Sequence, residues 1–244
     1  MDAGKINTKN ARDAIGAVDA KKALAVLSAF KQLYPDPRHY LIFENPFQLL
    51  VATILSAQCT DEKVNEVTAE LFRKYRAPAD FADEPADAIE RAVRPTGFFR
   101  NKAKAIKGAS AAIVERYGSS VPDTMDELLA LPGVARKSAN AILQHGFGKV
   151  EGIVVDTHVI RVAGRLGWTA NADPGKIEQD LMRLFDKKEW RRLPFYLKSH
   201  GRAVCKAPTP KCGECTVAAL CPSALVGPPK ASRRAIRSKR STRG

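Results

Sequence analysis

The sequence predicts an all-helical protein, and three observations lead to this fold class. Apolar residues recur at helical spacing along most of the chain, as they do at Leu24, Leu27, Phe30 and Leu33. Residues that commonly cap helix N-termini stand directly before several of these stripes. Only residues 153–155 resemble a strand, and that stretch is short. We therefore expect helices throughout, joined by turns.

The first two expected helices cover residues 21–33 and 47–57. Asn45 and Pro46 mark the start of the second one, because asparagine is a good N-cap and proline is favoured at the first helical position. The second helix is apolar on nearly all sides, which is typical of a helix inside a core.

The next expected helix follows Thr60, which can cap its N-terminus, and runs to residue 75. Asp61 and Glu62 lie in its first turn, where negative charge suits the positive end of the helix dipole. Further helices are expected over residues 85–93, 101–117, 124–131, 136–145, 157–166, 174–185 and 190–200.

The chain carries a large basic surplus. Its 244 residues include 40 Lys and Arg against 26 Asp and Glu, which gives a net charge of +14. This balance favours a polyanionic partner, nucleic acid before a membrane. Half of the surplus lies in residues 226–244, which contain seven basic residues and no acidic one. We expect this segment to be a disordered basic tail that adds salt-sensitive affinity for DNA.

The sequence gives no sign of a signal peptide or a membrane-spanning segment. The N-terminus is polar, and the longest apolar stretch, residues 47–57, is too short to cross a bilayer. We expect a cytoplasmic protein, associated with the nucleoid if DNA is its partner. Disulfides between its five cysteines are not expected in that reducing compartment.

The chain contains a tight turn between two expected helices. Pro132 and Gly133 end the first helix, and Arg136 begins the second. Only three residues are left for the turn itself, namely Gly133, Val134 and Ala135. The first backbone N–H groups of the second helix then point outward with the positive end of its dipole. An anion fits there, most simply a nucleic-acid phosphate.

Lys137 comes directly after this turn, and two interpretations of it remain open. In the first, it is one more cation that faces phosphate. In the second, it is an amine nucleophile, because the positive helix end and the neighbouring Arg136 both favour the neutral form of the amine. The turn alone does not decide between them.

A second glycine turn is similar to the first. Residues 97–106 match residues 133–142 at the glycine, the arginine, both alanines and the isoleucine. Any glycine turn before an amphipathic helix shares some of these features, so the match does not establish a repeat. Alternatively, the second turn faces the same ligand. Phe98 at its tip is either a core residue or a wedge for an opened base stack, and spacing alone favours the core.

Four cysteines near the C-terminus follow the spacing C-x6-C-x2-C-x5-C. They are Cys205, Cys212, Cys215 and Cys221. Prolines and a glycine between them are incompatible with a helix, so we expect the thiols to be ligands of a metal centre. Zn²⁺ and a [4Fe–4S] cluster both accept four thiolates, but zinc motifs more often pair two short C-x-x-C units, which favours the cluster. Lys206 and Lys211, in the first loop between cysteines, are placed to present cations to phosphates.

Asp156 stands before another helical stripe, and its simplest interpretation is an N-cap. The order of the motifs indicates more. The chain resembles the endonuclease III family of DNA glycosylases in the order of three motifs. These are Lys137 after the tight turn between two helices (the hairpin), the Val-Asp-Thr-His sequence around Asp156, and the spacing of the four cysteines. The resemblance covers residues 24–222 and includes the Leu-Ser-Ala-Gln segment that ends at Gln58.

The resemblance implies the helix-hairpin-helix DNA glycosylase fold, with two helical domains and an iron–sulfur cluster loop. Residues 39–149 would form a six-helix barrel domain that carries the hairpin. Residues 1–38 together with 150–225 would form the domain of the [4Fe–4S] cluster. DNA would be gripped where the two domains meet.

The resemblance also implies contacts with DNA. Residues 133–136 would hold the backbone phosphate beside the lesion. Gln58 matches the family residue that fills the gap left by a flipped base, although its spacing also suits a cap of its own helix. Phe98 falls where the family has an apolar wedge, usually a smaller one. Ala135 stands where the family usually has a second glycine, which bears on how closely the backbone approaches phosphate.

The activity implied is that of a bifunctional enzyme of base excision repair, acting as a monomer on oxidised pyrimidines and abasic sites in duplex DNA. Neutral Lys137 would attack C1′ of the flipped nucleotide and expel the base, and β-elimination would then cut the strand. Asp156 would accept the proton of the amine or stabilise the charge on the sugar. Two alternatives remain. One is an adenine-specific mismatch glycosylase, which generally lacks the lysine and has a large additional C-terminal domain; the other is a DNA-binding module without catalysis.

Overall fold

The computed structural model describes residues 18–36 and 40–224. Within these ranges the chain folds into helices and turns without a strand, which confirms the predicted all-helical class. None of the described helices is long and apolar enough to cross a membrane. The predicted basic tail at residues 226–244 and the first 17 residues of the predicted cluster domain lie outside the described residues.

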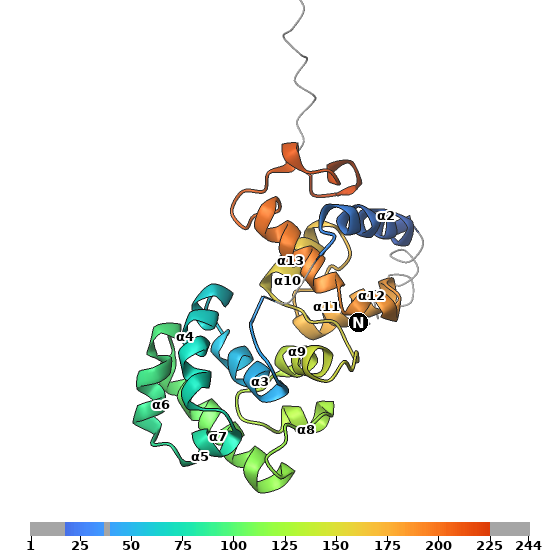
Figure 1. Cartoon of the computed structure of the whole chain (residues 1–244). Coiled ribbons are helices and arrows are strands. Elements are labelled where there is room, and N and C mark those ends of the chain that lie inside the picture. The colour runs from blue at the N-terminus through green and yellow to red at the C-terminus, as the bar shows by residue number, and fades with distance from the viewer. Residues whose placement is uncertain (1–17, 37–39, 225–244) are drawn as a thin grey trace, which may run out of the picture.

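The described chain forms two lobes (Figure 1). The first lobe, in the lower half of that view, consists of the consecutive helices from α3 to α9. Their bounds are α3 (Pro46–Leu55), α4 (Asp61–Lys74), α5 (Pro78–Asp83), α6 (Ala86–Val93), the 3-10 turn η1 (Arg94–Thr96), α7 (Phe99–Tyr117), α8 (Met125–Leu129) and α9 (Arg136–Gly146).

The second lobe combines the N-terminal helix with the C-terminal part of the chain. Its elements are α2 (Val18–Leu33), α10 (Thr157–Arg165), α11 (Pro174–Leu184), α12 (Lys187–Trp190), α13 (Leu193–Ala203), η2 (Cys212–Glu214) and η3 (Ala218–Leu220). Helix α2 packs against α13, and α10 also packs against α13. The loop with the four cysteines lies at the top of Figure 1, beyond the end of α13.

Each lobe has a hydrophobic core of its own. The buried apolar residues of the first lobe come from residues 41–143. Those of the second lobe come from residues 23–30 and 153–217, which explains why the N-terminal helix joins the C-terminal part. We propose that these two cores are those of the two domains predicted from the sequence.

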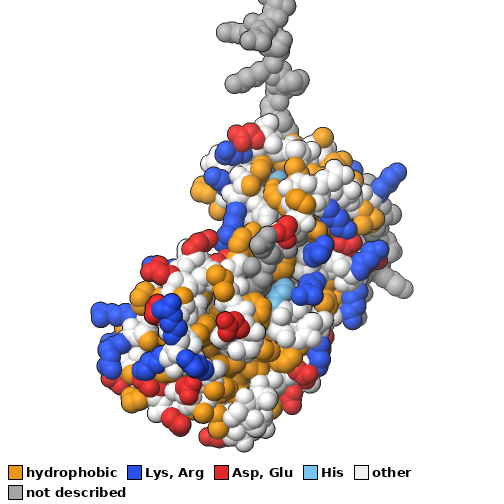
Figure 2. Space-filling view, in the orientation of Figure 1, with side chains coloured by type: hydrophobic (Ala, Val, Ile, Leu, Met, Phe, Trp, Pro, Cys, Tyr) orange, Lys and Arg blue, Asp and Glu red, His pale blue; other side chains and the backbone are white. Residues whose placement is uncertain are grey.

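Basic side chains occur on both lobes of the described chain (Figure 2). On the face shown in Figure 2, lysine and arginine side chains lie over both lobes, with acidic side chains between them. Charge alone therefore does not single out one DNA-binding surface on this face, and the local geometry of the pockets has to identify it.

Helix α3 is the central buried element of the first lobe. Asn45 caps it as predicted, because its side-chain oxygen accepts the N–H of Gln48 at 2.9 Å. Every residue from Phe47 to Leu55 is buried, in agreement with the apolar composition of the helix. The helix ends at Leu55 and not at residue 57, since Ser56 is its C-cap.

Two local features differ from what the sequence suggests. Residues 153–155 do not form a strand; they run as an extended connection in which Ile153 and Val155 are buried in the core of the second lobe. Helix α5 was not expected at all, because its six residues are too few for an apolar periodicity to be recognised. The fully buried ring of Phe81 holds α5 in place.

Candidate active site

Lys137 and Asp156 line the same pocket. The pocket lies between the two lobes, is open to solvent, and has an empty volume of about 570 Å³. Lys137 is in the first turn of α9, and Asp156 directly precedes α10. The other polar side chains that line the pocket are those of Tyr40, Thr53, Ser56, Asp61, Gln144, His145, Arg191 and Lys198. Side chains carried by different lobes therefore meet at one cavity.

The turn before Lys137 requires glycine at position 133. Gly133 has a φ of +78°, and a Cβ atom there would lie 2.6 Å from the Cβ of Ala105 in α7. Val134 is buried and fixes the turn to the core of the first lobe. Ala135 has an extended backbone, with φ −96° and ψ 169°, which any L residue adopts. The absence of a second glycine therefore causes no backbone strain.

The N-terminus of α9 is a suitable anion site. Its N-cap, Ala135, has no side chain that can accept a hydrogen bond, and no side chain caps the helix. The N–H groups of the first turn are left to water or to an anion, and the helix dipole favours negative charge there. These observations support a phosphate contact through the main chain at the start of α9, the C-terminal part of the predicted contact at residues 133–136.

The expectation that Arg136 favours a neutral Lys137 is wrong. The guanidinium of Arg136 forms an ion pair with Glu178 of α11, at 2.7 Å from Nε to Oε2, and this hydrogen-bonded partner raises the pKa of Arg136. Glu178 is buried, and it also accepts hydrogen bonds from Asn140 and from the main-chain N–H of Ile153. The positive charge of Arg136 is thus compensated by a contact between the lobes.

The pocket itself favours the neutral form of Lys137. Loss of hydration among the surrounding protein atoms lowers the pKa of Lys137, although the side chain keeps contact with solvent. The carboxylates of Asp156 and Asp61 oppose this lowering, and the ammonium of Lys198 adds to it. Hydration loss is the largest of these effects, so a larger fraction of the amine is unprotonated at neutral pH than in a lysine surrounded by water.

Asp156 is the N-cap of α10, as its simplest interpretation predicts. Its Oδ1 atom accepts the main-chain N–H groups of His158 and Val159, both at 2.9 Å. Asp156 also lines the pocket of Lys137, and its charge acts on the pKa of that amine. The cap therefore holds the carboxylate in place, and capping does not exclude a role in chemistry.

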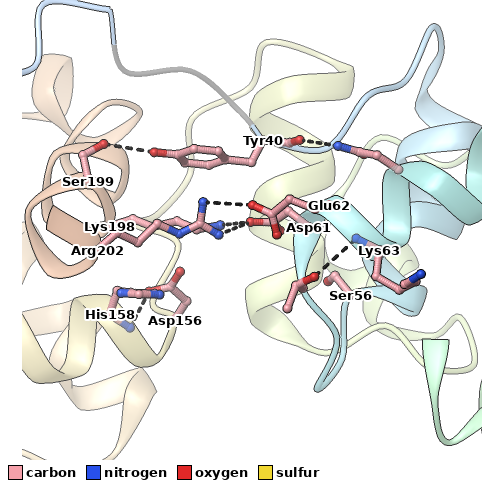
Figure 3. A network of polar contacts seen from close by, with 12 residues as sticks. Tyr40, Ser56, Asp61, Glu62, Lys63, Asp156, His158, Lys198, Ser199 and Arg202 are labelled. Atoms are coloured by element: carbon pink, nitrogen blue, oxygen red, sulfur yellow. Dashed lines mark hydrogen bonds and ion pairs between the residues drawn. The ribbon is translucent and has the colours of Figure 1, made fainter. Parts of the chain in front are cut away.

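A network of polar contacts joins the lobes beside the pocket (Figure 3). Asp61, at the start of α4, accepts hydrogen bonds from Lys198 at 2.6 Å and from Arg202 at 2.8 Å, both on α13. Both cations lie over the ring of Tyr40, each 4.5 Å from its centroid. The hydroxyl of Tyr40 lies 3.1 Å from that of Ser199. Residues 40 and 61 are thereby tied to the second lobe.

Sequence reasoning did not find this network. The sequence accounts for Asp61 by its favourable position at the positive end of the α4 dipole, and Lys198 belongs to no motif. The contacts of Asp61 join residues separated by 137 and 141 positions in the chain. The only local signal is the spacing of Lys198 and Arg202, which places both on one face of a helix.

Gln58 and Phe98 lie at the tips of two exposed turns. Both residues have left-handed backbones, with φ of +51° and +48°. Phe98 is 61% exposed, so the core position favoured by its spacing is wrong, and its exposure suits the alternative role of a wedge. Gln58 is exposed and does not cap α3, because Ser56 is the C-cap of that helix. Strained, exposed residues of this kind are often retained for function.

The four cysteines of the C-terminal loop line a second pocket. They are Cys205, Cys212, Cys215 and Cys221. Arg165 donates a hydrogen bond to Sγ of Cys205 at 3.3 Å, and burial raises the pKa of the Cys215 and Cys221 thiols. Within the described part of the chain, no three His, Cys, Asp or Glu side chains converge on a site for a single metal ion.

Lys206 and Lys211 are exposed in this loop, and neither lines the pocket of Lys137. Lys211 forms an exposed ion pair with Glu214 at 3.2 Å. Contacts of these two lysines with phosphate stay a prediction, and they would be made apart from the pocket.

Comparison with known proteins gives three consistent matches. Residues 51–187 match the family described as HhH-GPD superfamily base excision DNA repair protein. The chain is 52% identical to the endonuclease III of Synechocystis sp., over 84% of this chain and 93% of the relative. It is 43% identical to the endonuclease III of Bacillus subtilis, over 80% of this chain and 89% of the relative.

Solved structures agree with these relatives. The fold is similar to that of a non-covalent endonuclease III–DNA complex, with a TM-score of 0.81 and 40% identity, over 84% of this chain and 96% of that one. It is equally similar, with the same TM-score and identity, to a trapped covalent intermediate of endonuclease III with DNA.

Proposed function

The chain belongs to the endonuclease III family within the HhH-GPD superfamily, and on this premise we propose that it is a bifunctional DNA glycosylase and abasic-site lyase of base excision repair. The observation that carries the proposal is the meeting of Lys137 and Asp156 in one open pocket between the lobes. The pocket lowers the pKa of Lys137, which provides the neutral amine that a nucleophile needs.

The chemistry follows from these two side chains. The lone pair of Lys137 Nζ attacks C1′ of a flipped nucleotide, and the C1′–N bond breaks with its electron pair going to the departing base. Asp156 stabilises the positive charge that develops on the sugar and accepts the proton that the amine loses. The sugar ring opens to an imine between Lys137 and C1′. The imine acidifies the 2′ carbon, and loss of a 2′ proton expels the 3′ phosphate and cuts the strand.

The proposed substrates are oxidised pyrimidines and abasic sites in duplex DNA, in keeping with the family. The main chain at residues 133–136 holds the phosphate beside the lesion, Gln58 fills the gap left by the flipped nucleotide, and Phe98 enters the base stack as a wedge. We infer that the protein acts as a monomer on chromosomal DNA in the cytoplasm, in association with the nucleoid.

A panel of duplexes, each with one defined lesion, tests this function. We expect base removal and strand cleavage at thymine glycol and other oxidised pyrimidines, and cleavage at preformed abasic sites. Removal of adenine opposite an oxidised guanine, with no action on pyrimidines, would instead indicate the mismatch glycosylase. Binding without any cleavage would indicate a module without catalysis.

The cysteine loop is proposed to hold a [4Fe–4S] cluster. The donor set fits, because four thiols line one pocket and a [4Fe–4S] cluster is held by four cysteine thiolates. The four ligands would be Cys205, Cys212, Cys215 and Cys221. When bound, the cluster supplies four iron–sulfur bonds that hold a loop too short to fold by burial alone. Around it, Arg165 provides hydrogen bonds to the Cys205 thiol and to the loop main chain.

Purified protein is expected to be yellow-brown and to contain about four iron atoms per chain. Replacing Cys212 with alanine removes one ligand, so iron content and visible absorbance should fall. Cys59, half-buried in the first lobe and not a lining residue of the cysteine pocket, provides the control. Cys59→Ala should keep the colour. A colourless wild type with one bound zinc would contradict the cluster.

Lys198 is expected to contribute to the pH dependence of base removal. Its ammonium disfavours a second positive charge at Lys137, so Lys198→Met should raise the pKa of Lys137. Because the neutral amine is the reactive form, the acidic limb of the single-turnover rate profile should move to higher pH. Lys188→Met, at an exposed site on α12, should leave the profile unchanged. A limb that stays in place or moves to lower pH in Lys198→Met would contradict this electrostatic account.

A further inference from the structure

Lys102 is a buried lysine that the chemistry above does not use. Lys102 is only 4% exposed. Its ammonium donates hydrogen bonds to the main-chain oxygens of Leu55 at 2.8 Å and Thr96 at 2.7 Å. Burial lowers the pKa of Lys102. Both acceptors are carbonyls and not carboxylates, so no opposite charge offsets the cost of removing this amine from water in these two contacts.

The two carbonyls lie directly before two different turns. Leu55 is the last residue of α3, directly before the turn that carries Gln58. Thr96 ends η1 and directly precedes Gly97 and Phe98. One buried side chain therefore ties together the bases of both exposed turns.

Both turns need such support, because Gln58 and Phe98 have left-handed backbones. This conformation is strained for residues other than glycine, and it persists only where the surrounding structure holds it. In the described residues only one other non-glycine residue, Ser119, has a positive φ. Strain of this kind is thus concentrated at the two turns that Lys102 joins.

We propose that Lys102 is a positioning residue that fixes the separation of these two turns, so that Gln58 and Phe98 enter the duplex together during nucleotide flipping. The inference rests on the proposed function, because it assigns the two tips to opened DNA. A buried lysine is costly to remove from water, so its presence at this core position calls for a reason beyond the filling of space. What an apolar side chain lacks is a donor for each of the two carbonyls.

Two substrates, processed by the full-length protein with its cluster, separate positioning from folding. The first is a duplex with one oxidised pyrimidine, which has to be opened. The second is a single-stranded oligonucleotide with a preformed abasic site, which does not. Lys102→Met should lower the single-turnover rate on the duplex about tenfold, because small misplacements of positioning groups are costly. Cleavage of the single strand should change less than about twofold, since Lys137 and Asp156 stay in place.

Lys107 supplies a matched control on the same helix. Its ammonium also donates to two main-chain oxygens, those of Ala82 and Glu84, both at 2.6 Å. These acceptors lie at and just after the end of α5, away from both turns. Lys107→Met should therefore leave the ratio of the two rates unchanged. If Lys107→Met shows the same selective loss, or if Lys102→Met slows both substrates by one factor, the inference is wrong.

A double-mutant cycle tests whether Lys102 acts through the two tips. In a protein that already carries Gln58→Ala and Phe98→Ala, Lys102→Met should have almost no additional effect on the duplex. A full tenfold loss in that background would overturn the inference. If Lys102→Met does not fold, Lys102→Gln, which keeps a donor on a shorter side chain, takes its place. Lys102→Gln should lower the rate on the duplex by a smaller factor and again leave the rate on the single strand nearly unchanged. An equal loss of rate on both substrates would refute the inference. A wild type that processes neither substrate would refute the proposed function itself, whereas an active wild type with unaltered selectivity in the variants would refute only the role of Lys102.

Discussion

Replacing Lys137 with alanine is expected to abolish both base removal and strand cleavage, with a rate loss of roughly a thousandfold or more. The variant lacks the atom that attacks C1′ and forms the imine, so neither half of the reaction retains its covalent route. Single-turnover kinetics on a lesion duplex and on an abasic duplex measure the two halves separately.

Lys137→Ala should remain folded and should still bind DNA. The side chain is in contact with solvent in the first turn of α9, and alanine favours a helix at least as well as lysine does. We expect an unchanged melting temperature and lesion-duplex affinity within a few-fold of wild type by fluorescence anisotropy. Strand cleavage at a wild-type rate in this variant would show that the amine of Lys137 is not the nucleophile.

Replacing Asp156 with asparagine should lower the rate of base removal by roughly a hundredfold to ten-thousandfold. The amide cannot take up the proton of the amine, and it brings no negative charge to the developing cation of the sugar. Loss of this charge also lowers the pKa of Lys137 further, so the slower rate cannot come from protonation of the amine.

Alanine at the same position separates the chemical role from the cap. Asparagine keeps an oxygen for the N–H groups of His158 and Val159, so Asp156→Asn should melt close to wild type. Asp156→Ala loses that oxygen and should be less stable by about 1 kcal/mol, with a similar loss of activity. If activity instead follows stability, so that Asp156→Asn is active and only Asp156→Ala is impaired, the carboxylate is a cap and nothing more.

The parts of the site that could be predicted from the sequence depend on short-range chemistry. Gly133 has the positive φ of a tight turn, and Asn45, Thr60 and Asp156 cap the helices that directly follow them. Caps and turns of this kind involve neighbours within a few residues, so the residue types in a short stretch of sequence are sufficient to predict them.

The parts that could not be predicted depend on contacts between the lobes. Arg136 stands beside Lys137 in the chain, but its charge is taken up by Glu178, which is 42 positions away. The cation that does act on Lys137 is Lys198, which α13 brings to the pocket. The order of charges along a sequence does not reveal which charges meet after folding, and it does not reveal the loss of hydration in the pocket, which has the largest effect on the pKa of Lys137.

Phe98 shows a different limit of sequence reasoning. An aromatic residue at helical spacing is usually buried, and the pattern around residue 98 favours the core for that reason. Its left-handed backbone, directly after Gly97, which also has a positive φ, turns the side chain out to solvent. The hydrophobic pattern predicts a buried Phe98, and the backbone conformation of this single residue makes that prediction wrong.

Borohydride trapping on a lesion duplex, followed by peptide mapping of the linked residue, tests the central claim most directly. Reduction of the imine should join the wild-type protein covalently to DNA, and the modified peptide should contain Lys137. An active enzyme that forms no adduct, or an adduct at another amine of the pocket such as Lys198, would contradict the account.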